Sequence, residues 1–199
     1  MAKKTIGPTR DPLTVRAFPT PGAFEAWLAR HHETAPGVWL KFAKKSSGVA
    51  SVTYAEALEI ALCHGWIDGQ VKRLDECFYL QRFTPRARRS KWSKINCAKA
   101  DALIAAGRMK PAGLRQVEAA RSDGRWGFAY DSPRTATAHP DLLAALRKNG
   151  AAEKFFAALD RRNRYAIFYA VREAKKPETS ARRIARYVKM LARGKKPHP

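Results

Sequence analysis

The sequence has few acidic residues and few cysteines. Asp and Glu together number 17 in 199 residues, against 39 Lys or Arg, so the formal net charge at pH 7 is +22. The three cysteines form no C-x-x-C pair and stand far apart, at Cys63, Cys77 and Cys97. An odd number of separated cysteines indicates reduced thiols and fits a cytoplasmic protein. We expect no metal site, because His31–His32 and the Cys63–His64 pair lack partners at ligand spacing.

Long apolar runs are also absent. The longest, Ala55–Cys63, is interrupted by Glu56 and Glu59, whereas a membrane-spanning helix needs about 20 apolar residues. The first ten residues, MAKKTIGPTR, carry no apolar stretch behind their charges, so we expect no secretory signal. The sequence therefore predicts a soluble cytoplasmic protein that does not insert into a membrane.

Signatures of the common enzyme classes are missing. The chain contains no G-x-S-x-G, no P-loop, no G-x-G-x-x-G and no H-E-x-x-H. Asp68, Asp75 and Glu76 lie near the predicted central strands and could supply acid–base chemistry, but we favour an ion pair between Asp68 and an arginine of residues 82–89. We assign no catalytic residue and no cofactor, and the sequence favours a protein that is not an enzyme.

The excess of basic residues is the strongest signal in the composition. A positively charged protein attracts nucleic acid, anionic lipid headgroups and other polyanions. The alternative is a surface rich in arginine and lysine that only keeps the protein soluble. We therefore expect the partner to be an anionic small molecule or a polyanion such as nucleic acid. The oligomeric state is not defined by the sequence.

The first two thirds of the chain predict a small β-sheet packed against helices. Residues 1–17 are expected to form a basic flexible arm, and residues 18–124 an α+β domain. Thr20-Pro21 is typical of a helix start, and Thr53-x-x-Glu56 is a capping box before a second helix. Alternation of apolar and polar residues predicts the strands Val38–Ala43, Trp66–Asp68 and Phe78–Thr84.

From Lys91 onwards the chain predicts helices and a linker. A helix is expected from Lys91 to Gly107 and another from Pro111 to about Asp123. Residues 125–138 are aperiodic and rich in turn-forming residues, which is typical of a linker. Residues 139–196 then form an all-α module whose three helices are predicted at Pro140–Lys148, at Ala151–Tyr169 with a break around residues 160–163, and at Pro177–Arg193.

The corner between the last predicted strand and the next helix is the main candidate site. Six basic residues and no acid lie between Arg82 and Lys94, and a helix N-terminus beside arginines is a good anion site. Pro85 stiffens the turn, and Ser90 is expected to cap the helix. The predicted ligand-binding residues are Trp66, Asp68, Arg82, Arg86, Ser90 and Trp92. The alternative is a solvated basic loop with its aromatic residues in the core.

A second basic cluster lies on the last predicted helix. Its cations recur at the spacing of one helix face, at Arg182, Arg186, Lys189 and Arg193. An apolar stripe is expected to pack in the core on the opposite face, at Ala181, Ile184, Val188 and Leu191. The basic face could bind phosphate groups, but a solvated outer face is the reading we favour.

Several long motifs resemble a known bacterial family. GWIDG, YLQRFTPR and the run SKWSKIN, with GVWLKFAKKSSG before them, are similar to the YdeI/OmpD-associated (OmdA-like) family. The segment FFAALDRRNRYAIFYAVREAKKPETSARRIARYVKMLARGKK is similar to the C-terminal helical module of that family, which also occurs in YdhG-like proteins. Together the two similarities cover most of residues 18–196.

The resemblance implies a role in stress or in protection against bacteriocins and antimicrobial peptides, with no catalytic residue assigned to the family. Many such peptides are cationic, so a protein of charge +22 would repel them. Protection through an anionic ligand or partner is therefore the leading hypothesis. The alternatives are a nucleic-acid-binding protein that uses the basic clusters, and an enzyme with a pocket around Trp66–Gly69 and Arg82–Trp92.

Overall fold

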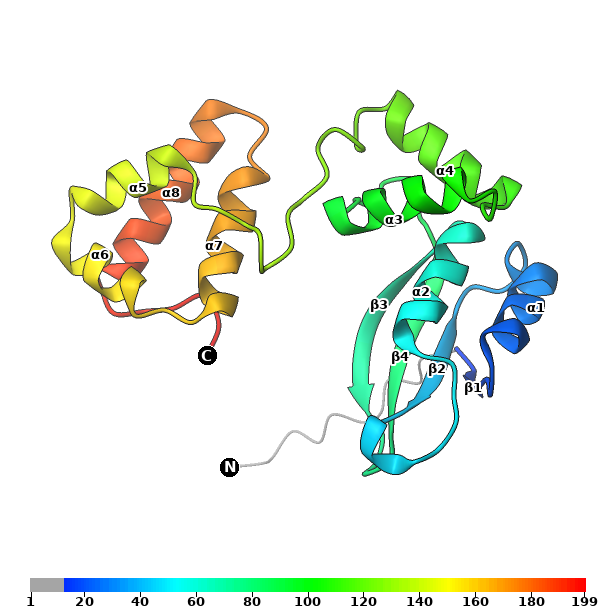
Figure 1. Cartoon of the computed structure of the whole chain (residues 1–199). Helices are drawn as coiled ribbons and strands as arrows, with labels where there is room; N and C mark the ends of the chain where they lie inside the picture. Colours follow the sequence, from blue (N-terminus) through cyan, green and yellow to red (C-terminus); the bar gives the residue numbers. More distant parts are fainter. Residues whose placement is uncertain (1–12) are drawn as a thin grey trace, which may run out of the picture. The chain divides into compact units, whose positions relative to one another are not determined.

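The computed structural model describes residues 13–199 and divides them into two compact units (Figure 1). Unit 1 comprises the described residues up to Trp92 together with Asn96–Ala129, and unit 2 comprises Ser93–Ile95 and Tyr130–Pro199. Residues 1–12 of the predicted arm lie outside the described residues. The predicted linker, residues 125–138, is divided between the two units, which meet in sequence after Ala129.

Unit 1 is built on a four-stranded sheet with the strand order β1-β2-β4-β3. In this sheet β1 pairs with β2 in parallel, and β4 runs antiparallel to both β2 and β3. The strands are β1 (Val15–Ala17), β2 (Val38–Ala43), β3 (Trp66–Arg73) and β4 (Phe78–Pro85). The sheet beside helices, followed by a helical unit, confirms the predicted α+β class.

The strand predictions differ from the structure most at β1. The strand β2 has the predicted bounds, and β3 extends five residues beyond the predicted end at Asp68. Residues 15–17 were expected in the flexible arm, but they form β1 and pair with β2, with Val15 opposite Trp39. The strand β1 has only three residues, all of them exposed, and a strand is recognised from alternation over four or more residues.

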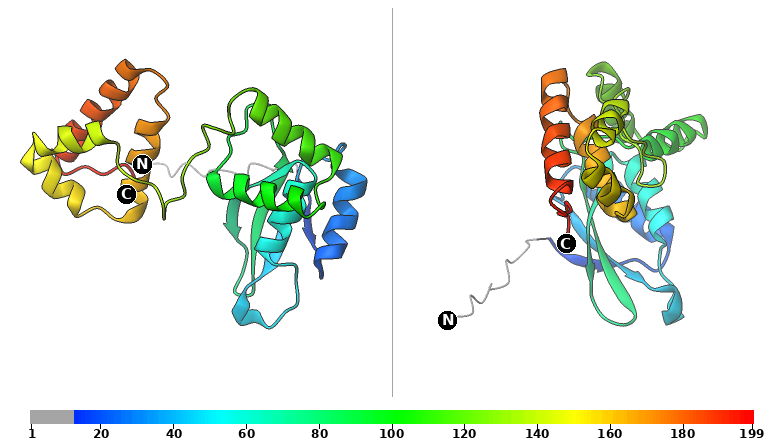
Figure 2. Two further views of the ribbon diagram at one scale, coloured as in Figure 1. Left: turned by 45° about the horizontal axis from the view of Figure 1, so that its top comes forward. Right: turned by 90° about the vertical axis from the view of Figure 1, so that its left-hand side faces the viewer.

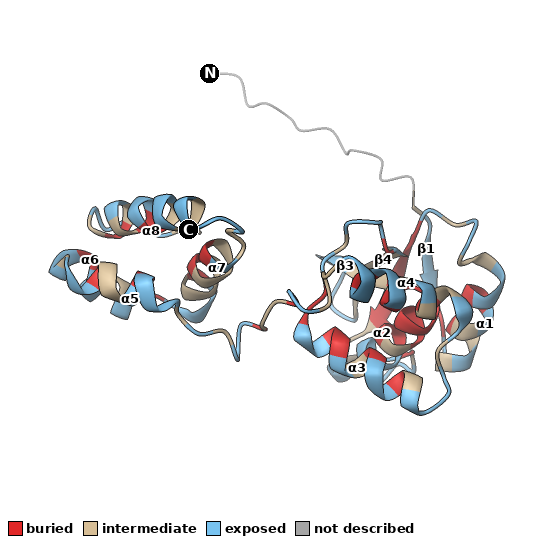
Figure 3. Ribbon diagram, turned by 90° about the horizontal axis from the view of Figure 1, so that it is seen from above, coloured by how far each residue is buried: buried red, intermediate tan, exposed pale blue. Residues whose placement is uncertain are grey.

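Two helices cover one face of the sheet, as Figure 2 shows. In α1 (Pro21–His31) the Thr20 side chain accepts a bond from the third helical amide, and α2 (Tyr54–Cys63) carries the predicted capping box. Buried residues gather where these helices meet the sheet (Figure 3). This core contains Phe24, Trp27, Leu28, Val38, Leu40, Phe42, Trp66 and Phe83.

A second core in unit 1 joins α2 to α3 (Lys94–Ala105) and α4 (Pro111–Ser122). Its buried residues include Leu58, Leu62, Trp92, Leu103 and Val117. The predicted helix start at Lys91 is wrong, because α3 begins at Lys94. Ser93, just before the helix, instead forms an isolated β-bridge with Tyr130.

Unit 2 consists of four helices, one more than predicted. They are α5 (Pro140–Arg147), α6 (Gly150–Ala157), α7 (Arg161–Arg172) and α8 (Pro177–Leu191). The predicted break becomes a full separation of α6 from α7, because the Asp160 side chain accepts a bond from the Asn163 amide at 2.8 Å and caps α7. The four helices enclose one core that includes Leu142, Leu146, Ile167, Val171, Ile184, Tyr187 and Leu191.

Candidate anion-binding site

The two tryptophans of the predicted corner lie in different cores of unit 1. Trp66 and Trp92 are each 1 % exposed. The Trp66 indole N–H donates to the carbonyl oxygen of His32 at 3.0 Å, whereas Trp92 packs on Trp126 with ring centroids 4.8 Å apart. The structure therefore does not bring the two indoles together as the opposite walls of one ligand pocket.

The two arginines of the corner have different surroundings. Arg86 is only 5 % exposed, and its guanidinium carbon lies 3.5 Å from the centroid of the Trp92 ring while one guanidinium nitrogen donates to the carbonyl of Lys91. Arg82 lies on β4 opposite Trp39, on the sheet face away from α2. Arg86 is thus built into the second core, and Arg82 is the more accessible of the two.

The polar residues of the corner also bind to other parts of unit 1. Asp68 accepts a hydrogen bond from the Tyr54 hydroxyl at 2.9 Å, a partner that our sequence reading did not foresee. Ser90 does not cap α3, which begins four residues later, and its carbonyl accepts a bond from Arg125 at 2.8 Å. The assignment of these residues to a ligand stays a prediction.

Three cations of the second basic cluster lie on α8 as predicted, whereas Arg193 lies just beyond the helix, which ends at Leu191 rather than at Arg193. The four cations of this cluster are exposed, and the opposite face of the helix packs in the core through Ile184, Tyr187 and Leu191. Ala181, which we expected in the apolar stripe, is exposed. One member of the cluster, Arg186, also lines a pocket with residues of α7.

This pocket is open to solvent, has a volume of about 720 Å³, and is lined by α7, α8 and the C-terminal tail. Such a volume lies in the range of small-molecule sites. The lining residues include two arginines, three tyrosines and one histidine and no acid: Arg162, Tyr165, Ala166, Tyr169, Arg186, Tyr187, Met190, Pro197 and His198. We call this site the α7–α8 pocket.

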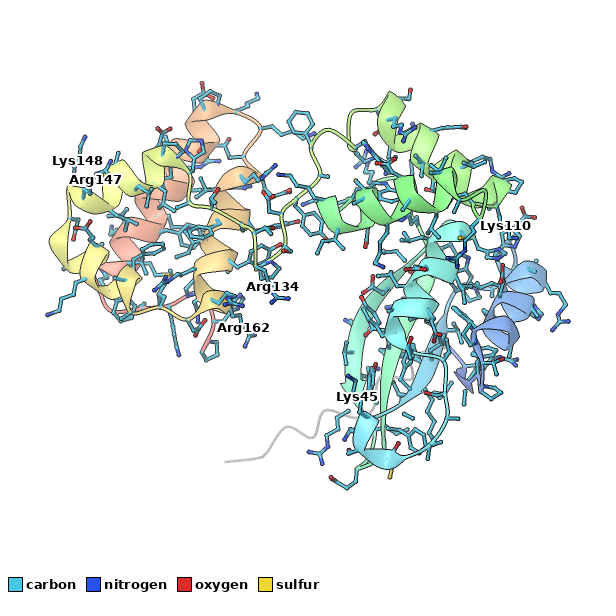
Figure 4. The ribbon with its side chains drawn as sticks, in the orientation of Figure 1. Lys45, Lys110, Arg134, Arg147, Lys148 and Arg162 are labelled. Atoms are coloured by element: carbon cyan, nitrogen blue, oxygen red, sulfur yellow. The ribbon has the colours of Figure 1, made fainter. Side chains whose placement is uncertain are left out.

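The α7 side of the pocket is formed by residues on one face of that helix. Arg162, Tyr165 and Tyr169 recur at i, i+3 and i+7, so they share one face of the helix. Figure 4 shows Arg162 at the first turn of α7, near the end of the chain. The Tyr165 and Tyr169 rings lie 5.9 Å apart between centroids. Burial raises the pKa of Tyr165, and its hydroxyl donates to the Asp131 carbonyl at 3.0 Å.

The α8 side and the tail complete the pocket. The Arg186 guanidinium lies 4.9 Å from the centroid of the Tyr187 ring, a contact that orients the cation beside an aromatic face. The backbone N–H of His198 donates to the side-chain oxygen of Asn163 at 2.8 Å, and the Asn163 amide nitrogen donates to Asp160 at 2.9 Å. Asn163 is 1 % exposed, so a buried amide holds the tail against the start of α7.

The arrangement suits a molecule with an anionic group and a flat ring. Guanidinium groups bind carboxylates and phosphates through paired hydrogen bonds, and tyrosine rings offer apolar faces with polar tips. In residues 13–199, no group of three or more His, Cys, Asp or Glu side chains could hold a metal ion. No helix in the same residues is long and apolar enough to cross a membrane.

Two family models match different parts of the chain. One is described as a domain of unknown function (DUF8412) and matches residues 16–116, and the other, OmdA, is described as Bacteriocin-protection, YdeI or OmpD-Associated and matches residues 135–194. No curated protein and no solved structure matches the chain. The resemblance to the OmdA family is thus confirmed for the helical unit, while that to YdhG-like proteins is not shown. The DUF8412 match covers half of the 199 residues, so the chain belongs to the DUF8412 family, with an OmdA domain after that match.

Proposed function

We propose that this chain is a cytoplasmic protection factor of the YdeI/OmpD-associated type that acts by binding an anionic, ring-bearing small molecule in the α7–α8 pocket. The observation that carries the proposal is the lining of that pocket, where two arginines and three tyrosines meet without an acid. The pocket also lies within residues that the OmdA family model matches, apart from the tail.

The charge of the protein supports an indirect mode of protection. A chain of net charge +22 repels cationic peptides and attracts anions. Arg162 and Arg186 are exposed at the pocket, so they can reach a ligand without first breaking a buried ion pair. Protection would then follow from sequestering or sensing an anionic metabolite, rather than from contact with the peptide itself.

Calorimetric titration with phenyl phosphate tests the binding step, with phenol and inorganic phosphate as probes of each half of the ligand. We expect phenyl phosphate to bind more tightly than either half. The double variant Arg162→Ala/Arg186→Ala should weaken binding about tenfold or more, because each lost guanidinium removes a charge-assisted hydrogen bond.

The matched control is Arg182→Ala/Arg193→Ala, which removes the same number of charges outside the pocket. Arg182 lies on the exposed face of α8 and Arg193 just after the end of that helix. This control should retain the affinity of the parent protein. Equal losses in the two double variants would show a diffuse charge effect and would contradict the assignment of the pocket. In cells, deletion of the gene followed by challenge with polymyxin-like peptides tests protection, and unchanged survival across several peptides would overturn that role.

A second candidate function, binding of single-stranded nucleic acid, is favoured by the sheet face that α1 and α2 leave uncovered. Lys41 and Lys72 lie over aromatic rings of that face, 3.8 Å from the Phe78 centroid and 4.1 Å from that of Trp39. Asp68 is the one acid in the four strands, and it bonds to Tyr54 of α2. Single-strand binding combines basic side chains that follow the phosphates with aromatic rings on which bases stack, and Phe78 is the half-buried ring of this face, whereas Trp39 is buried.

Gel shifts with a labelled oligothymidine over a salt series test this second function. Lys41→Ala/Lys72→Ala/Arg82→Ala should lose at least about tenfold in affinity and should flatten the dependence on salt, because phosphate contacts release counterions. Arg182→Ala/Lys189→Ala/Arg193→Ala has the same change in charge and should bind as the parent does. If only the α8 variant loses binding, the sheet face is not the nucleic-acid site.

A further inference from the structure

Unit 1 contains a smaller pocket at the edge of its sheet. It lies between the residues around β1, the end of α1 and the turn that leads into β2, and its volume is about 240 Å³. That volume is on the order of eight water molecules at the density of the liquid, which suits a small ion or a short organic acid. The lining residues are Leu13, Thr14, Arg16, Trp27, His31, Thr34, Ala35, Pro36 and Gly37.

Hydrogen-bond donors dominate the polar part of this lining. Arg16 contributes a guanidinium, His31 an imidazole, and Thr14 and Thr34 a hydroxyl each, while no acid is present. The Arg16 guanidinium carbon lies 5.7 Å from the centroid of the Trp27 ring, and the His31 ring lies 5.0 Å from it. The arginine and the histidine are therefore held around the same indole.

The Trp27 side chain forms a rigid wall beside these groups. It is 7 % exposed, and among the described residues its indole nitrogen has no hydrogen-bond partner. That nitrogen is closed off from solvent, so Trp27 contributes its ring to the pocket rather than its N–H. The ring is fixed by its neighbours, with the Trp66 ring at 5.9 Å edge-on and the Phe24 ring at 6.4 Å in a stacked arrangement.

The backbone keeps the turn close to the sheet. Gly37 has φ +150, and a Cβ at this position would lie 2.9 Å from both the Phe83 carbonyl oxygen and a methyl group of Thr84. Glycine is thus needed for the turn to pass so near β4. The wall of the pocket that carries Thr34 is consequently anchored at a fixed distance from the strand.

We propose that this pocket is a second binding site, distinct from the α7–α8 pocket, that takes a small oxyanion, a carboxylate or a phosphate group. Arg16 supplies the charge, Thr14, Thr34 and His31 supply hydrogen-bond donors, and the Trp27 ring forms the wall beside them. The site lies in the DUF8412 part of the chain, and its ligand does not depend on the function proposed for the helical unit.

Nuclear magnetic resonance of the full chain tests the proposal through the indole N–H signals of its five tryptophans. Trp27→Phe identifies the signal of Trp27 by its loss. Titration with inorganic phosphate, and separately with acetate, at constant ionic strength should shift that signal in a saturable way, because an anion bound by Arg16 changes the charge beside the Trp27 ring. If only one of the two anions gives a saturable shift, that anion identifies the ligand group as a phosphate or as a carboxylate.

Matched variants separate the site from a general charge effect. Arg16→Ala should weaken the response of the Trp27 signal about tenfold, whereas Arg30→Ala, which removes an exposed arginine of α1 outside the pocket, should leave it unchanged. Arg162→Ala/Arg186→Ala should leave it unchanged as well, which distinguishes this site from the α7–α8 pocket. An indole signal that neither anion moves, or equal effects of Arg16→Ala and Arg30→Ala, would overturn the proposal.

Discussion

At the scale of single residues, buried polar side chains define both the fold and its sensitivity to pH. Arg86 and Asn163 are almost fully buried and join separate segments through their hydrogen bonds. His64 is different, because it is 5 % exposed and, among the described residues, neither ring nitrogen has a hydrogen-bond partner. Its burial, together with the nearby His32 ring, lowers the pKa of His64 below the ordinary value of 6.5.

The shifted histidine predicts a loss of stability in mild acid. Because the pKa of His64 is lowered in the folded state, the unfolded chain takes up the proton first as the pH falls through 6.5. The stability contribution of His64 is fully present above that pH and is lost as the pH falls toward the lowered pKa of the folded state, by at most about 1.4 kcal/mol per unit of pH. Urea unfolding at pH 7.5 and 5.5 should show this loss in the parent protein and a smaller one in His64→Phe. Equal losses in both proteins would show that another group is responsible.

At the scale of elements, the sequence predicted the helices and strands whose sequence patterns lie within a few neighbouring residues. The apolar alternation of β2 and the capping box at Thr53 each lie within a few neighbouring residues, and both appear in the structure. The strand β1 was missed because its stability comes from pairing with β2 rather than from its own residues. The α7–α8 pocket was missed because its two arginines, Arg162 and Arg186, are far apart in the sequence and are brought together only by the packing of the helices. The spacing of Arg162, Tyr165 and Tyr169 was the one local signal, since it places the three residues on one face of α7.

The contact between α2 and α4 depends on one small residue. A Cβ at Gly113 would lie 2.3 Å from the carbonyl oxygen of Cys63 and 2.7 Å from that of Leu62. Gly113→Ala should therefore lower the free energy of unfolding by about 2 kcal/mol, even though alanine favours a helix by about 1 kcal/mol over glycine. Gly150→Ala in α6 is the control, because no atom lies within 4 Å of its Cβ, and it should not destabilise the protein. A neutral Gly113→Ala would mean that α4 can move away from α2 without cost.

At the scale of the whole molecule, the chain combines two units with separate cores and different family matches. A unit with its own core can fold independently. We therefore expect a fragment of residues 1–129 to give a mixed helix and strand signal in circular dichroism, and a fragment of residues 130–199 to give a helical one. Each should unfold cooperatively on heating. A purely helical spectrum for the first fragment would contradict its four-stranded sheet.

The most direct test of the central claim, that the α7–α8 pocket holds an anionic ring-bearing ligand, is a crystal of the full chain soaked with 4-bromophenyl phosphate. The account predicts an anomalous peak for bromine beside the rings of Tyr165, Tyr169 and Tyr187, with density for the phosphate next to Arg162 and Arg186. A bromine peak at the Arg82 corner instead, or an empty pocket at a concentration that saturates binding in solution, would contradict it.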